Sequence, residues 1–135
     1  MKVVLLGQHQ WVCLVLRALL GQGHAIATVV TETDAFEAWR VKDNRRFARY
    51  CAYDFLVRVA RSLGLQVHQP ADFHDPGFQE LLESLAAELF VCVSYYTILK
   101  SPFLSEYPGR VINAHLAPLL HYRGRAPLKL GDPAR

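Results

Sequence analysis

The chain has 135 residues and a formal net charge of +3, a length that suits one globular domain. Hydrophobic residues make up 52% and charged residues 20%, which excludes a disordered segment and a coiled coil. The mild charge tolerates an anionic substrate without by itself indicating nucleic acid, and no apolar run is long enough to span a bilayer.

The first 30 residues predict a strand, a helix and a second strand. Lys2 to Gly7 is a continuous apolar run, which is typical of a strand covered on both faces. Apolar residues then recur at helical spacing from Val12 to Leu19, and the pattern stops at Gly21-Gln22-Gly23. Ala25 to Val30 is rich in β-branched residues and predicts a strand parallel to the first.

The middle of the chain is less regular. Thr31 to Asn44 has no clear period and is predicted to be a long loop. Helical spacing returns between Arg45 and Leu63, and "LQVHQP" predicts a short third strand. Asp75-Pro76 predicts the start of another helix, because aspartate caps the free amides and proline fits the first turn.

Leu89 to Ser94 and Arg110 to Asn113 predict a fourth and a fifth strand, joined by a turn-rich connection. Alternating strands and helices predict an α/β fold, an open, mostly parallel Rossmann-like sheet with flanking helices. We expect residues 1–135 to form one domain, with an irregular tail at 129–135. Ligands of such sheets collect beyond the carboxyl ends of the strands.

Four segments are expected at this rim, and they are 7–10, 31 onward, 94–99 and 113–125. The first strand is followed by "GQHQWV", which has one glycine where the dinucleotide fingerprint needs three. This spacing argues against a nicotinamide or flavin cofactor.

The cysteines and histidines give no sign of a metal site. Cys13, Cys51 and Cys92 are isolated from one another, which argues against a disulfide framework and suits a reducing cytoplasm. We expect all three to be small buried side chains. The histidine spacings make no convincing metal site, so no metal is expected.

Asn113 and His115 stand two residues apart at the end of the fifth predicted strand. On extended backbone such residues project to one face together with Val111. An amide can stabilise an oxyanion and a histidine can move a proton near neutral pH, so the pair suits acyl-type transfer. The alternative is that Asn113 caps a turn and His115 is a surface residue.

The longer string "NAHLAPLLHYRGRAP" resembles the signature of the folate-dependent formyltransferases. Upstream, "VSYYTILKSPFLSEYPGRVIN" and "VVTETD" are similar to other parts of that family, so the resemblance covers residues 1 to about 128. It implies 10-formyltetrahydrofolate as formyl donor and a primary amine as acceptor, with an amino sugar nucleotide favoured. The initiator-tRNA enzyme of the family carries a further domain. In this chain only a cluster at Arg45, Arg46 and Arg49 hints at RNA binding, and the cluster could equally be the solvated face of a helix.

The resemblance also implies roles for individual residues. Asn113 would stabilise the oxyanion, and His115 would shuttle or stabilise charge as the folate nitrogen departs. Arg123 and its neighbour Tyr122 would have a structural or substrate-binding role. The wall that holds the pterin end of the donor would consist of Ser94, Tyr95, Tyr96, Ile98 and Leu99, although Tyr95, Ile98 and Leu99 could equally be ordinary core packing.

The sequence departs from the family pattern after His115. Ala117 stands where the family commonly has serine, and the only acid that follows is Asp132, outside the context of the family's catalytic aspartate. We therefore expect a truncated catalytic domain, incomplete at its C-terminus and with little activity alone. The alternative function is an inert module that binds folate or a partner. An exposed sheet edge would also favour a homodimer or self-association.

Overall fold

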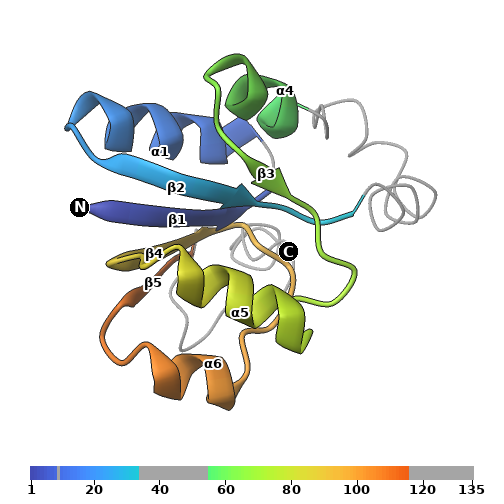
Figure 1. The fold of residues 1–135 in the computed structure, drawn as a ribbon. Helices are drawn as coiled ribbons and strands as arrows, with labels where there is room; N and C mark the ends of the chain where they lie inside the picture. The colour runs from blue at the N-terminus through green and yellow to red at the C-terminus, as the bar shows by residue number, and fades with distance from the viewer. Residues whose placement is uncertain (9, 34–54, 116–135) are drawn as a thin grey trace, which may run out of the picture.

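The computed structural model describes residues 1–8, 10–33 and 55–115, which form a parallel sheet with helices on both faces (Figure 1). In chain order the described elements are β1 (Lys2–Gly7), α1 (Gln10–Gly21), β2 (Ala25–Val30), α4 (Phe55–Ser62), β3 (Val67–His68), α5 (Pro76–Ser84), β4 (Leu89–Val93), α6 (Ser101–Glu106) and β5 (Val111–Ala114). The five predicted strands are confirmed, and the ends of β1 and β2 match the prediction.

The strands run parallel in the order β3-β2-β1-β4-β5. The strands β2 and β3 lie on one side of β1, and β4 and β5, which come later in the chain, lie on the other. The strand order therefore reverses between β1 and β4, where Gly7 pairs with Val93. This arrangement confirms the predicted open, parallel α/β sheet and places its switch point beside Gly7.

The central strand β1 separates two apolar layers. Val3 and Leu5 pack in a layer with residues of α1 and α4, whereas Val4 and Leu6 pack in a layer with residues of α5 and α6. All four side chains are fully buried. Because both faces of β1 are covered, its sequence is a continuous apolar run and does not alternate with polar residues.

The layer beneath α5 and α6 is rich in aromatic rings. Phe90 of β4 contacts the ring of Phe103 at 5.1 Å between centroids and that of Tyr107 at 4.5 Å. Phe73 lies 5.1 Å from Phe103 in an edge-to-face arrangement. Such pairs add to the apolar burial, so this layer fixes α6 against the sheet.

The start of α5 is also confirmed. The Asp75 side chain caps the helix by accepting a hydrogen bond from the backbone N–H of Phe78 at 3.0 Å, and Pro76 occupies the first turn.

The structure corrects the turn-rich connection between the last two strands, because part of it is the helix α6. Pro102 lies in its first turn, where a missing N–H is tolerated. Six residues are too few to show helical periodicity, and the buried Phe103 holds the segment against the core.

Several predictions lie outside the described residues. These are most of the long loop, the first part of the helix at 45–63 with its arginine cluster, Cys51 and everything after His115. Within the part of the chain that the structure describes, none of the helices combines the length and apolar character that crossing a membrane requires.

Candidate functional site

The carboxyl ends of β1, β2, β4 and β5 meet at one edge of the sheet (Figure 1). The last residues of β1, β4 and β5 lie level with one another, since Gly7 pairs with Val93 and Val93 with Ala114. The described parts of the four predicted segments, residues 7–8, 31–33, 94–99 and 113–115, therefore share this rim. Ligands of open parallel sheets bind at such a rim, which makes it the candidate functional site.

Asn113 is exposed near the end of β5, where it pairs with Cys92 of β4. Val111, two residues earlier, packs partly against the layer under α5 and α6, so Asn113 faces the same side of the sheet. His115 is half-buried and follows the last residue of the strand. The structure thus brings Asn113 and His115 to the rim beside the segment that follows β4.

Cys92, the strand neighbour of Asn113, is buried. Burial raises the pKa of its thiol to about 12, so the thiol stays protonated at neutral pH. A protonated thiol is a poor nucleophile, which argues against a covalent role for Cys92 next to Asn113. Cys13 is buried too, which confirms the prediction for both of these cysteines.

Raising the pH is expected to weaken the fold through Cys92. A thiol with a raised folded-state pKa contributes its full stability below its usual value of 9.0 and loses it as the pH rises toward about 12. The loss is about 1.4 kcal/mol per pH unit, or about 2 kcal/mol by pH ~10.5. Urea unfolding between pH ~8 and ~10.5 should show a shallower decline for Cys92→Ala than for the wild type. Identical slopes would contradict the expectation.

The segment after β4 begins with an unusual backbone conformation. Ser94 has φ 53, a left-handed value that is uncommon for a residue other than glycine and that tends to occur at functional sites. Tyr95 and Leu99 pack partly against the layer under α5 and α6, and burial followed by the nearby Glu32 charge raises the pKa of Tyr95. The Ile98 side chain is 80% exposed. Of these three residues, Ile98 has the side chain most open to a ligand.

Glu32 ties this segment to the end of β2. Its carboxylate Oε1 accepts hydrogen bonds from the backbone N–H groups of Tyr96 at 3.2 Å and Thr97 at 3.0 Å. The Thr97 hydroxyl donates to the same oxygen at 3.1 Å. Glu32 is only 7% exposed, and its own carbonyl accepts from the side chain of Gln69 at 2.9 Å.

His74 holds the other end of the same segment. Its Nε2 lies 2.9 Å from the carbonyl oxygen of Ile98 and 3.4 Å from the backbone nitrogen of Lys100. One ring nitrogen cannot donate and accept at once, and the shorter contact identifies Nε2 as the donor to Ile98. Residues 96–98 are therefore fixed from two directions.

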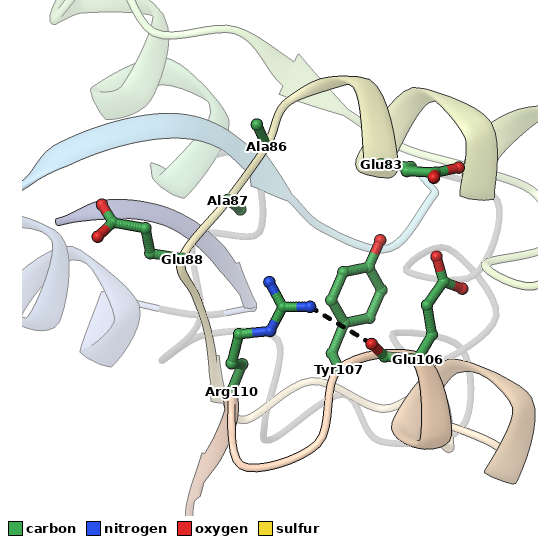
Figure 2. Close-up of a pocket in the computed structure, with 7 residues that line it drawn as sticks. All are labelled: Glu83, Ala86, Ala87, Glu88, Glu106, Tyr107 and Arg110. Carbon is green, nitrogen blue, oxygen red and sulfur yellow. Dashed lines mark hydrogen bonds between the residues drawn. The ribbon is translucent and has the colours of Figure 1, made fainter.

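A cavity of about 410 Å³ lies at the opposite end of the sheet (Figure 2). It is lined by residues that precede β4 and β5, among them the exposed Glu88 and Arg110 and the buried Tyr107. The Arg110 guanidinium donates to the backbone carbonyl of Glu106 at 3.3 Å and lies 4.9 Å from the centre of the Tyr107 ring. Burial first, and then nearby carboxylates, raise the pKa of Tyr107. This cavity lies at the amino ends of the strands, away from the rim where parallel sheets bind ligands.

A family model described as formyl transferase matches residues 1–131. The chain belongs to the formyl transferase family.

Solved structures with similar folds carry related names. Phosphoribosylglycinamide formyltransferase from Anaplasma phagocytophilum is 16% identical with a TM-score of 0.69, and the match covers 96% of this chain and 56% of that chain. The Bacillus halodurans protein of the same name is 14% identical with a TM-score of 0.72, over 100% and 66%. A formyltetrahydrofolate deformylase from Pseudomonas syringae pv. tomato is 22% identical with a TM-score of 0.65, over 96% and 40%. At these identities the likeness shows the fold, and the chain spans between 40% and 66% of these proteins.

The sequence alone did not point to the two residues that fix the segment after β4. Glu32 lies in the quoted "VVTETD", directly after a buried strand, and a carboxylate at that place is a detectable signal. His74 lies in a loop before α5, and no spacing relates it to Ile98. Tyr122 and Arg123 lie outside the described residues.

Gln8 is a further rim residue, at the carboxyl end of β1. It is 1% exposed, and its side-chain oxygen is buried with no hydrogen-bond partner among the described residues. An unpaired buried acceptor destabilises the folded state by about 1–3 kcal/mol. Gln8→Met is therefore expected to raise the free energy of unfolding by about 1 kcal/mol in urea. The exposed Gln66→Met should change little, and a destabilised Gln8→Met protein would refute the expectation.

Proposed function

We propose that this chain takes part in the transfer of a formyl group from 10-formyltetrahydrofolate to a primary amine. The observation that carries the proposal is the family match over residues 1–131, combined with the exposed Asn113 beside His115 at the rim of the sheet. An amide and an imidazole in this position suit a reaction that passes through a tetrahedral intermediate.

The proposed chemistry needs one bond to form and one to break. The acceptor nitrogen attacks the formyl carbon, and the formyl oxygen takes up negative charge, to which the Asn113 side-chain N–H donates. His115 accepts the proton that the attacking nitrogen loses and returns it to the departing folate nitrogen. Collapse of the intermediate breaks the bond between the formyl carbon and the folate.

The donor is proposed to lie against Ser94, Tyr95, Tyr96, Ile98 and Leu99. Support comes from the exposed Ile98 side chain and from the fixed backbone around it. Tyr95 and Leu99 contribute from beneath, since both pack partly into the adjoining layer.

The acceptor is proposed to be an amino sugar nucleotide. Its phosphates suit a chain with a formal charge of +3, and Tyr122 and Arg123 are the proposed contacts. The proposal takes residues 1–135 as one domain acting in the cytoplasm. The half-exposed Ile112 on β5 favours self-association, which sedimentation would detect.

A direct transfer assay tests this function. The chain is mixed with 10-formyltetrahydrofolate carrying a labelled formyl group and with amino sugar nucleotides, and the labelled amide is measured. Label in the product supports the proposal. Saturable donor binding without product would favour the second candidate, a module that binds folate without turnover. Neither binding nor transfer by the folded chain would refute both.

A further inference from the structure

We infer that Glu32 and His74 are positioning residues that hold the backbone of residues 96–98 in the shape that receives the folate donor. The inference rests on the proposed function and extends it to two residues that touch the segment from outside. Neither is proposed to contact the reacting atoms.

Glu32 acts across the switch point of the sheet. It follows β2, whereas the amides that it binds follow β4, and β1 lies between these two strands. The Glu32 carboxylate therefore connects two sides of the rim, since Tyr96 and Thr97 are 64 and 65 residues away from it in sequence. Movement of the segment away from the rim would break both backbone hydrogen bonds together.

The chemistry of the contact makes it strong. Burying a carboxylate is unfavourable unless hydrogen bonds compensate, and here two backbone N–H groups and one hydroxyl donate to it. Hydrogen bonds to an ionised acceptor are roughly twice as strong as neutral ones. An apolar side chain in place of Glu32 would leave the half-buried amides of Tyr96 and Thr97 without this acceptor.

His74 completes the arrangement at Ile98. Its ring N–H binds the Ile98 carbonyl, while the Ile98 side chain remains 80% exposed. The backbone is thus held on the protein side and the apolar side chain is directed to solvent. An apolar group presented in this way suits contact with the flat ring system of a reduced folate.

The two contacts should act on donor affinity and leave the chemical step unchanged. If the segment is in the receptive shape only part of the time, the apparent Kd equals the intrinsic Kd divided by the fraction of molecules that have this shape. Once the donor is bound, the segment is in place and Asn113 and His115 are unaffected. A rise in KM for the donor with a constant kcat is therefore the expected signature.

The test compares Glu32→Leu and His74→Phe with the wild type. Calorimetric titration with 10-formyltetrahydrofolate should show a Kd raised by about tenfold or more in each variant, and in the transfer assay KM should rise while kcat changes less than about twofold. Hydrogen exchange of the Tyr96 and Thr97 amides, measured without donor, should accelerate by about tenfold or more in Glu32→Leu. Glu32→Gln keeps one acceptor oxygen and should recover much of the affinity.

Two controls separate positioning from general stability. Glu88 also accepts a backbone hydrogen bond, from Lys2 at the opposite end of the sheet, so Glu88→Leu removes a similar contact without touching the segment. It should leave the donor Kd unchanged. Where Glu32→Leu fails to fold, Thr97→Val, which removes only the hydroxyl donor, should still raise the Kd by about threefold.

The outcomes distinguish this inference from the proposed function. If the wild type binds the donor and the folded Glu32→Leu and His74→Phe variants bind it with the same Kd, the inference is overturned and the proposed function is not. Equal losses in kcat and affinity would also overturn it, because they would place these residues in the chemical step. A wild-type chain that does not bind the donor would overturn the proposed function, and the inference with it.

Discussion

Asn113→Ala is expected to lower the rate of formyl transfer by about a hundred- to a thousand-fold, because it removes the amide that donates to the oxyanion. The donor Kd should change little, since the negative charge develops only after the amine attacks. Single-turnover transfer from labelled 10-formyltetrahydrofolate measures the chemical step directly. His115→Ala should lose about a hundred- to ten-thousand-fold through the missing proton transfer.

Ile112→Ala is the matched control for Asn113→Ala. Ile112 precedes Asn113 on β5, is 51% exposed and lies on the opposite face of the strand. Its loss perturbs the same strand without removing a polar group from the rim, so transfer should stay within about twofold of the wild type. Undiminished transfer by folded Asn113→Ala, or an equal loss in Ile112→Ala, would contradict the assigned role.

Gly7→Ala is expected to be the most damaging substitution among the glycines that the structure describes. A Cβ at Gly7 would lie 2.4 Å from the carbonyl oxygen of Val93 and 2.6 Å from a methyl group of Val12. The first contact is with backbone of the paired strand β4, so relief requires β1 and β4 to separate at the switch point. Overpacking of this kind lowers the free energy of unfolding by about 3 kcal/mol, which urea denaturation would measure.

Gly21→Ala provides the comparison for Gly7→Ala. Gly21 is the last residue of α1, and a Cβ there meets no atom within 4 Å. Alanine in a helix is favoured over glycine by up to about 1 kcal/mol, so this variant should be as stable as the wild type or more so. Equal free energies of unfolding for the two variants would contradict the close approach of β1 and β4 at Gly7.

The central strands were predictable because a strand that is buried on both faces consists mostly of apolar and β-branched residues. β1 and β4 are apolar runs, β2 is rich in β-branched residues, and the structure places the three strands adjacent in the middle of the sheet. The helix α5 was predictable because Asp75-Pro76 is a local start signal.

The helix α6 and the contacts of residues 96–98 were not predictable in this way. Phe103 holds α6 through ring contacts with Phe73, which precedes α5, and with Phe90, which lies on β4. Glu32 and Tyr96 are 64 residues apart, and only the strand order brings them together. Such contacts follow from topology, which a single sequence does not specify residue by residue.

The rim position of Asn113 and His115 was predictable from their place after a buried strand. Their chemistry was not predictable from spacing alone, because a turn cap and a surface histidine fit Asn-x-His as well. The resemblance around residues 89–127 favoured the catalytic interpretation, and the family match now supports the same proposal.

The most direct test of a donor site at the carboxyl ends of the strands maps donor binding residue by residue. Amide chemical shifts of the labelled chain are followed by NMR during titration with a stable reduced-folate analogue of 10-formyltetrahydrofolate. A donor site at the rim predicts the largest shifts at residues 94–99 and 113–115, with little change around Glu83 and Arg110 at the opposite end of the sheet. Shifts concentrated at that opposite end, or none at millimolar analogue, would contradict a donor site at the carboxyl ends of the strands.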